Sequence, residues 1–311
     1  MAILRGPGFR ISLLTTLFLA LGAPDLAASC GDSPSPGVDW SKCNKSRKMI
    51  VGTDLTGSRL AGANLSATDL TKTVLAKADL TDANLSGSSL RGADLQEADL
   101  SRVRGLNTLF GNVKASKSKF LNAELLGADF TKADLNGAQM GWAVLRRSNL
   151  TGAMLTGTGF VKADLSRATL DDAQLENANF TRAQGIRATL KRVKAANANF
   201  SKVEFLRARF PEADLTGANF TKAELARAVM MDATLKGASF KYANVSRATF
   251  VGSTLDGADF SGAYTYLMRI EGVDLSGTTG LNASQLELAC GDTATVLPSG
   301  MARPASWPCE D

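Results

Sequence analysis

The chain has no histidine among its 311 residues, and aromatic residues make up only 6% of it. Histidine is the commonest general base of enzymes and the commonest metal ligand, so its absence argues against most hydrolases and metal centres. Cysteine is also scarce, and its four copies lie only near the two ends of the chain. We therefore expect a protein that is not an enzyme, has no cofactor or metal site, and takes no small-molecule substrate.

The N-terminus has the pattern of an export signal. Arg5 and Arg10 supply positive charge, residues 11–21 form an apolar run, and the small residues 27–29 follow Pro24. An apolar run this short cannot span a bilayer, which needs about 20 residues. The pattern predicts a cleaved signal peptide and a periplasmic or secreted protein.

The cysteines fall into two terminal pairs, Cys30 with Cys43 and Cys290 with Cys309. In an oxidising compartment, cysteines at such positions predict disulfide bonds. The sequence does not fix the connectivity, and pairing within each end is the simplest choice. A second interpretation is a membrane-anchored lipoprotein acylated at Cys30, which would leave Cys43 without its nearest partner.

The middle of the chain repeats every five residues. In "ADLTDANLSGSSLRGADLQEADL" (78–100) a leucine stands at each fifth position, and the register continues without a slip from Ile50 to Leu275, through about 45 pentads. The residue two positions before each centre is small, usually alanine. Side chains two positions apart point to the same side of an extended segment, so each pentad predicts one inward pair followed by a turn.

A second period of 20 residues is superimposed on the first. Phenylalanine recurs at this spacing among centres that are otherwise mostly leucine: Phe160, Phe180, Phe200, Phe220, Phe240 and Phe260. Four pentads that close a square coil would place residues 20 apart on neighbouring coils, about 4.8 Å from each other. The period therefore predicts a square coil with phenylalanine rings stacked on one inner side. Gly105 and Gly185 are exceptions, being centres without a large side chain.

The pentads "ANLSG" (83–87), "ADLTG" (213–217), "ANFTK" (218–222) and "ADFSG" (258–262) resemble the motif of the pentapeptide-repeat family. The resemblance extends over roughly residues 48–280. It implies an all-β fold, a right-handed quadrilateral β-helix with the alanine and the leucine or phenylalanine inside. It also implies that a homodimer can form through a C-terminal cap, although a tail fastened by a disulfide could block this.

Both ends depart from the repeat and predict caps. The N-terminal end is rich in proline, serine and glycine, and the C-terminal end has a leucine stripe typical of a short helix, with Asn282 or Ser284 as its N-cap. We divide the chain into a signal peptide (1–29), an N-terminal cap (30–47), the repeat β-helix (48–280) and a helical C-terminal cap with its tail (281–311). The caps would cover the open ladder at each end of the β-helix.

Aspartates recur because the outward second position of the motif favours Asp or Asn. Examples are Asp79, Asp94, Asp99, Asp129, Asp134, Asp164, Asp214 and Asp259. Such side chains commonly form turns in contact with water. Stacked carboxylates could bind calcium, but the glycine-rich aspartate loop of calcium-binding solenoids is missing from the sequence, so we assign no metal site.

Basic residues also follow the period of 20. One series is Arg147, Arg167, Arg187, Arg207, Arg227 and Arg247, and a second is Lys162, Arg182, Lys202 and Lys222, bracketed by Trp142 and Tyr242. In a square coil the two series would lie on adjoining edges and form a cationic strip about 25 Å long. Two interpretations remain open: Asp164, Glu204 and Glu224 on the intervening face neutralise the strip, or the strip binds an anionic partner.

The sequence favours a non-catalytic exported scaffold with a rigid, partly basic binding surface. The expected partner is an unknown protein or an anionic polymer or lipid surface, since guanidinium groups suit both phosphate and carboxylate. The resemblance offers a second hypothesis, an acidic rod that imitates DNA and binds a topoisomerase. The export signal and the basic charge argue against it, and a nucleic-acid partner is not expected. A third hypothesis is a carbohydrate-acting β-helix enzyme, but the chain lacks the long loops that build a catalytic groove.

Overall fold

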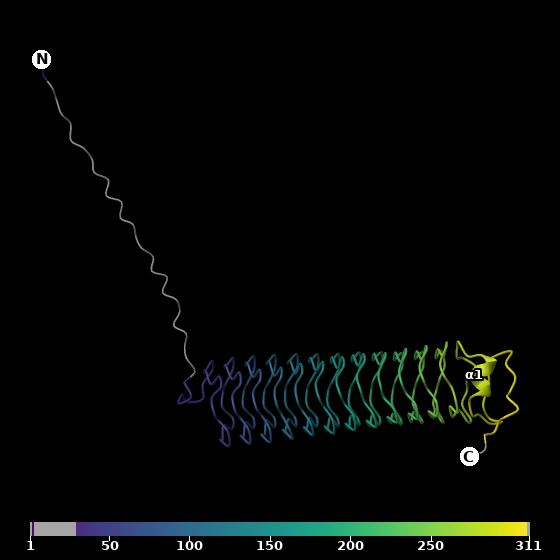
Figure 1. The fold of residues 1–311 in the computed structure, drawn as a ribbon, viewed down its shortest axis with the longest axis horizontal. Helices are drawn as coiled ribbons and strands as arrows, with labels where there is room; N and C mark the ends of the chain where they lie inside the picture. The colour runs from purple at the N-terminus through teal and green to yellow at the C-terminus, as the bar shows by residue number, and fades with distance from the viewer. Residues whose placement is uncertain (1, 3–28, 310–311) are drawn as a thin grey trace.

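The computed structural model, which describes residue 2 and residues 29–309, is a straight rod of stacked coils (Figure 1). Parallel bridges join residues 20 apart, from Asp39↔Arg59 to Asp259↔Thr279. One bridge recurs in each pentad, so each coil has four sides. The square coil predicted from the two periods is confirmed. The predicted signal peptide, apart from its last residue and residue 2, lies outside the described residues.

The interior of the rod is filled by the two inward residues of each pentad. The small residue and the central Leu or Phe are both buried, as at Ala83 and Leu85. The phenylalanines from Phe160 to Phe260 stack with nearly parallel rings, whose centroids lie 4.7 to 5.1 Å apart. This matches the spacing of neighbouring strands, so one ring per coil continues the stack without a gap.

The repeated aspartates hold the turns. The Asp54 carboxylate accepts hydrogen bonds from the backbone N–H (2.9 Å) and the hydroxyl (2.6 Å) of Thr56, two residues later. The backbone contact recurs at Asp79, Asp94, Asp99, Asp129, Asp134, Asp164, Asp214 and Asp259. A side chain that accepts from the backbone two residues later fixes a turn. The prediction that these aspartates form turns is therefore confirmed.

The same hydrogen bonds lower carboxyl pKa values. The Thr56 hydroxyl, followed by the Thr56 N–H, holds the pKa of Asp54 below its usual range, and Thr71 acts in the same way on Asp69. A carboxyl whose pKa is lower in the folded state contributes stability above its unfolded pKa of about 3.9. That contribution disappears as the pH falls through the lower, folded pKa.

We expect the free energy of unfolding to be nearly equal at pH 7 and pH 5 and to fall below about pH 4. The variant Asp54→Asn/Asp69→Asn keeps an oxygen that accepts from the backbone but has no carboxyl to protonate, and Asn64 already fills this position. Its loss of stability between pH 5 and pH 3, measured by urea titration, should be smaller than that of the parent chain. Equal losses would contradict this role of the carboxylates.

The corners of each coil lie two residues after the centre, where the backbone adopts left-handed φ values. Glycine fills many corners without strain, as at Gly87 (φ +69°) and Gly127 (φ +68°). Other corners carry long side chains at similar angles, among them Arg147 (φ +58°) and Arg247 (φ +55°). Because a side chain in this region costs about 1 kcal/mol or more, the backbone does not by itself favour arginine there.

Gly105 and Gly185 are pentad centres without a large side chain, and a side chain of the neighbouring coil fills the space beside each of them. A Cβ added at Gly105 would lie 2.9 Å from Leu125 Cδ2, and one added at Gly185 would overlap the Phe205 ring. The Phe205 ring packs against Phe180, with centroids 6.3 Å apart. Phe205 therefore occupies the volume that a larger residue at position 185 would need.

Gly185→Ala is expected to destabilise the rod by about 1–3 kcal/mol, because the new methyl group collides with the Phe205 ring. Combined with Phe205→Leu, the change should cost less than the sum of the two separate effects, since leucine frees part of the contested volume. Urea unfolding of the parent, both single variants and the double variant measures this coupling. Strictly additive losses would refute the packing relationship.

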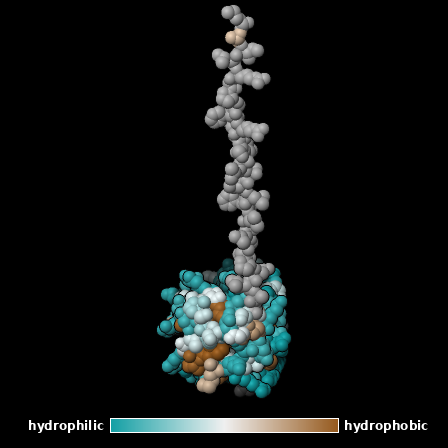
Figure 2. All heavy atoms as spheres, turned by 90° about the vertical axis from the view of Figure 1, so that its left-hand side faces the viewer, coloured by the Kyte–Doolittle hydropathy of each residue, from teal (hydrophilic) through white to brown (hydrophobic). Residues whose placement is uncertain are grey.

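The coil begins nearer the N-terminus than the sequence analysis places it. Asp39 and Asn44, assigned to the N-terminal cap, already form ladder bridges, because the buried Trp40 fills an inward position. The segment 30–47 is thus partly coil. Figure 2 shows this end of the rod, where apolar surface lies among polar residues; Met49 and Val51 are exposed apolar residues of the first coil.

Both disulfides join cysteines within one end of the chain. Cys30 is bonded to Cys43 and Cys290 to Cys309, with Cα atoms 5.4 Å apart in each pair. The simplest connectivity considered in the sequence analysis is therefore the one present. Each disulfide cross-links two residues within one end of the chain. It therefore restricts the unfolded chain at a place where the repeat has a neighbouring coil on one side only.

The C-terminal end carries the helix α1 (Ala283–Glu287), at the right-hand end of the rod in Figure 1. Asn282 is its N-cap, and the Gln285 side chain completes a capping box. Gln285 Nε2 also donates to the carbonyl oxygens of Phe260 (3.0 Å) and Ala263 (2.9 Å). One buried amide therefore attaches the helix to the ladder.

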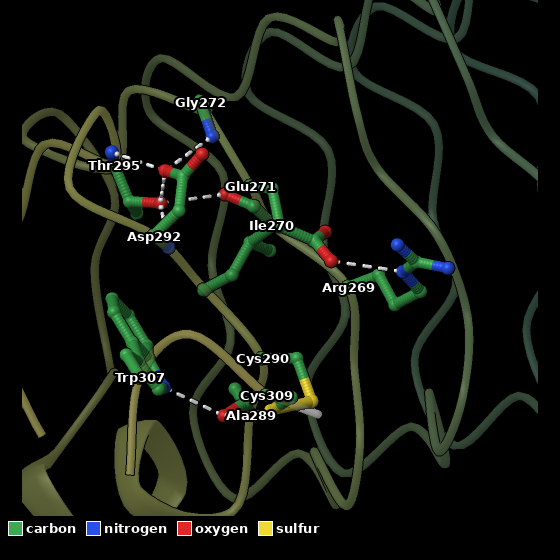
Figure 3. Close-up of polar contacts among 10 residues, drawn as sticks. All are labelled: Arg269, Ile270, Glu271, Gly272, Ala289, Cys290, Asp292, Thr295, Trp307 and Cys309. Carbon is green, nitrogen blue, oxygen red and sulfur yellow. Dashed lines mark hydrogen bonds and ion pairs between the residues drawn. A yellow bond between two sulfur atoms is a disulfide. The ribbon is translucent and has the colours of Figure 1, made fainter. Parts of the chain in front are cut away.

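The tail after α1 adds further rungs to the ladder. Cys290 bridges Arg269 at a separation of 21 residues, one more than in the coils. Trp307 Nε1 donates to the Ala289 carbonyl oxygen at 2.7 Å, beside the disulfide between Cys290 and Cys309 (Figure 3). The tail is therefore part of the β-structure as well as a cover for it.

Candidate functional site: two basic columns

The two basic series form columns at adjoining corners of the rod. The arginine column consists of Arg147, Arg167, Arg187, Arg207, Arg227 and Arg247, and the mixed column of Lys162, Arg182, Lys202 and Lys222. All ten residues stand at corners with φ between +55° and +61°. Every member of both columns is exposed except Lys162, which is half-buried. The rod therefore presents ten cations along one side.

None of these ten cations lies within 4.0 Å of a carboxylate in the part of the chain that the structure describes. Other corner cations are paired between neighbouring coils. Arg102 binds Asp82 through two contacts of 2.8 and 2.7 Å, and Arg192 binds Asp172 through contacts of 2.7 and 2.8 Å. At these corners a basic and an acidic residue follow each other on neighbouring coils and neutralise each other. In the arginine column only basic residues follow each other.

The carboxylates between the columns contact other groups. Asp164 lies 3.5 Å from Arg146, which belongs to neither column, and Glu224 accepts a hydrogen bond from the Asn244 amide at 2.9 Å. In the described part of the chain, neither these carboxylates nor Glu204 forms an ion pair with a member of either column, and partial neutralisation of the columns stays a prediction. We name as the basic face residues 142–147 and their equivalents in the next five coils, which hold eleven basic and three acidic residues.

Two shallow grooves run along the arginine column. One, of about 500 Å³, is lined by Leu126, Arg146, Arg147, Asp164, Ser166, Arg167 and Gln184. The other, of about 510 Å³, is lined by Ser166, Arg167, Ile186, Arg187, Leu206 and Arg207. Ile186 and Leu206 place apolar surface between the guanidinium groups of the second groove. Such a groove suits an anionic group that is attached to an apolar body.

Aromatic rings lie beside the columns. Lysines of the mixed column approach Trp142 and Tyr242, with Nζ 3.9 Å and 6.0 Å from the ring centroids. The sequence analysis overlooked Tyr264 and Tyr266, whose ring centroids lie 6.3 Å apart. Tyr264 bridges Asn244 in the ladder of the basic face. The period of 20 was therefore a sufficient signal to place both tyrosines next to the columns.

The chemistry available at the columns is binding. Across residue 2 and residues 29–309, three or more potential metal ligands nowhere gather in one place. The same residues contain no helix with the length and apolar character needed to cross a bilayer. Arginine and lysine side chains supply positive charge and hydrogen-bond donors, which suit carboxylate, sulfate or phosphate groups.

Similar chains occur among solved structures, whereas no curated protein matches the sequence. HetL of the cyanobacterium Nostoc, a pentapeptide repeat protein involved in heterocyst differentiation regulation, is 26% identical over 71% of this chain and 91% of its own, with a TM-score of 0.39. A pentapeptide repeat protein of the Arabidopsis thaliana thylakoid lumen is 27% identical over 37% of this chain and 69% of its own (TM-score 0.26). QnrB1, a plasmid-mediated fluoroquinolone resistance protein, is 22% identical over 65% of this chain and 88% of its own (TM-score 0.27).

Two family models match the repeat region. The model described as pentapeptide repeats (8 copies) matches residues 50–87, 68–104, 109–147 and 143–182, and the model described as a pentapeptide repeat region matches residues 203–279. Together they cover more than half of the chain. The TM-scores of the solved structures lie below 0.5, so the assignment rests on these family models. The chain belongs to the pentapeptide-repeat family.

Proposed function

We propose that this chain is a non-catalytic exported scaffold whose basic columns bind an acidic partner, either a protein or an anionic polymer or lipid surface. The observation that carries the proposal is the arginine column, in which six like charges follow one another without an ion pair in the described part of the chain. Family membership supports the scaffold role, because repeat rods offer long, regular faces for binding.

Electrostatics makes the arginine column costly without a partner. Neighbouring coils lie about 4.8 Å apart, which is shorter than the screening length of about 8 Å at physiological salt. Like charges on neighbouring rungs therefore repel each other even at physiological salt. An acidic partner neutralises these charges on binding. The relief of the repulsion then contributes to the binding free energy.

The backbone does not account for the arginines. Gly87 and Gly127 fill the same corner in coils nearer the N-terminus, with φ of +69° and +68°. Glycine adopts these angles without strain, whereas arginine does not. Lysines at corners outside the columns, such as Lys72 (φ +57°), show the same strain, so it is the repulsion between successive arginines that favours a role in binding.

The remaining parts of the proposal concern export and organisation. We propose a signal peptide (1–29), an N-terminal cap (30–47) whose later residues already join the coil, a right-handed β-helix (48–280) and a C-terminal cap with its tail (281–311). The disulfide at Cys30 supports a periplasmic or secreted protein over a lipoprotein, because it leaves no thiol there for acylation. The basic sign of the columns argues against an acidic rod that imitates DNA, and the short pentads argue against a carbohydrate-acting enzyme.

The test replaces four members of the arginine column by glutamine: Arg167→Gln, Arg187→Gln, Arg207→Gln and Arg227→Gln. Its matched control is Lys72→Gln, Lys77→Gln, Lys117→Gln and Lys132→Gln, which removes the same charge at corners with the same left-handed φ but outside both columns. Retention is measured on anionic liposomes, DNA and peptidoglycan. We expect the column variant to lose at least about tenfold in affinity for its preferred surface, and the control less than about twofold.

Equal retention of the parent, column variant and control on every surface would overturn the proposal and reduce the columns to a solvated face. Equal losses in the column variant and the control would show that net charge, rather than the column, binds the surface. Thermal melting of all three proteins shows whether a change in retention reflects lost folding. A pull-down with the intact chain then identifies the partner.

A further inference from the structure

The exposed aromatic rings of the described chain all lie on or beside the basic face. They are Trp142 (55% exposed), Tyr242 (64%), Tyr264 (51%) and Tyr266 (41%). Trp40 is buried in the first coil, and the phenylalanines with described side chains are buried in the core. The four exposed rings of the described chain therefore gather on one side of the rod.

The rings lie at both ends of the cationic strip. Trp142 opens the mixed column, and Tyr242 closes it. Tyr264 and Tyr266 follow one coil later, and Tyr266 lies 5.9 Å from the Arg247 guanidinium. From Trp142 to Tyr266 the face covers about six coil steps, or roughly 30 Å. A ligand that reaches both groups of rings must therefore be extended.

The middle of the face carries hydrogen-bond acceptors. The ladder positions between the two columns hold Asp164, Gln184, Glu204 and Glu224. The columns on either side carry only donors, because arginine and lysine have no acceptor. A fitting ligand therefore has anionic groups toward its edges and hydroxyl or amino donors along its middle.

These three features discriminate between classes of partner. A phosphodiester backbone or a layer of anionic lipid head groups would bring negative charge against the carboxylates of the middle line and has few hydroxyl groups to donate to them. A linear sugar polymer has hydroxyl groups that donate to carboxylates, and its rings have apolar faces that pack on aromatic side chains. Carboxylate or sulfate groups on the sugars pair with guanidinium groups.

We infer that the acidic partner is a linear polysaccharide bearing carboxylate or sulfate groups, and that it lies along the basic face with sugar rings stacked on Trp142 and the tyrosines. This inference rests on the proposed function, because it names the partner of the same columns. It adds a residue set that the anion-binding role alone does not require. The added residues provide the test.

The test compares two anionic polymers of equal charge and similar length. Polygalacturonate carries its carboxylates on sugar rings, whereas poly-L-glutamate carries them on flexible side chains without rings. The variant Trp142→Ala/Tyr242→Ala/Tyr264→Ala/Tyr266→Ala removes the aromatic rings, and alanine already occupies a corner at Ala67 (φ +54°). Its control is Met49→Ala/Val51→Ala/Met231→Ala, which truncates exposed apolar side chains away from the basic face.

We expect the parent chain to bind polygalacturonate at least about tenfold more tightly than poly-L-glutamate. The aromatic variant should lose this preference and keep its affinity for poly-L-glutamate, and the control should behave as the parent. Monomeric galacturonate should bind far more weakly than the polymer, because it cannot reach both ends of the face. Melting temperatures equal to that of the parent confirm that the exposed substitutions leave the fold intact.

Three outcomes separate this inference from the proposed function. If the parent chain binds both polymers equally and the aromatic variant is unchanged, the columns bind anions but the polysaccharide inference is wrong. If single-stranded oligothymidylate or phosphatidylglycerol vesicles bind more tightly than polygalacturonate, the inference is also wrong. If the parent chain binds none of these anions, both proposals fail.

Discussion

Replacing Phe200 with alanine is expected to lower the free energy of unfolding by about 3–5 kcal/mol. The Phe200 ring is buried, and its centroid lies 4.8 Å from that of Phe180 and 4.9 Å from that of Phe220 in the same stack. It also meets Phe205 and Phe210 edge-on, at 5.9 and 6.0 Å. Alanine would leave a cavity that the neighbouring coils cannot close, because their backbone ladder holds them at a fixed spacing.

The control for this prediction is Phe200→Leu. Leucine is the usual centre of a pentad, so it fills most of the volume and should cost only about 1 kcal/mol. Urea unfolding followed by circular dichroism ranks the three proteins. A loss below about 1 kcal/mol for the alanine variant would show that the phenylalanine stack is not a main source of stability.

The variant Arg187→Glu/Arg227→Glu is expected to be more stable than the parent chain and to bind anions about a hundredfold more weakly. Each new glutamate stands between two arginines on neighbouring coils, an arrangement that Asp172 and Arg192 already show with contacts of 2.7 and 2.8 Å. Pairs of this kind contribute about 0.2–1 kcal/mol each. Binding falls because two cations are lost and two negative charges enter the column.

The matched control is Lys72→Glu/Lys132→Glu. It makes the same change in net charge at corners that lie between Gly52, Gly92, Asn112 and Gly152, where no new pair along the column forms. It should neither gain stability nor lose binding by more than about twofold. If the column variant gains no stability, the repulsion attributed to the arginine column is absent; if it binds as well as the parent, the column is not the binding site.

Much of the fold was accessible from the sequence because each structural unit is only five residues long. The pentad register placed Ala83 and Leu85 inside, and the period of 20 predicted the stack from Phe160 to Phe260, both as observed. Such local periodicity needs no knowledge of distant contacts, since each coil repeats the environment of the previous one. The positions of the two basic columns followed from the same arithmetic.

The ends and the charge pairing were not accessible in the same way. Asp39 and Asn44 join the coil because Trp40 fills an inward position. A search for leucine or phenylalanine at every fifth position does not detect a tryptophan there. The backbone of Cys290 forms a ladder bridge with Arg269 at a separation of 21 residues, which departs from the period of 20. Asp164 lies beside both columns yet pairs with Arg146, because the choice depends on side-chain conformations that spacing does not fix.

The central claim is that the arginine column, and not net charge, binds an acidic partner. The most direct measurement is the affinity for polygalacturonate as a function of salt concentration, for the parent chain, the four-glutamine column variant and its four-lysine control. Each cation that engages an anionic polymer steepens the slope of log affinity against log salt by about 0.7–0.9. We expect the slope of the column variant to be shallower by about 3, and that of the control to equal the parent. Equal slopes in all three proteins would contradict the claim.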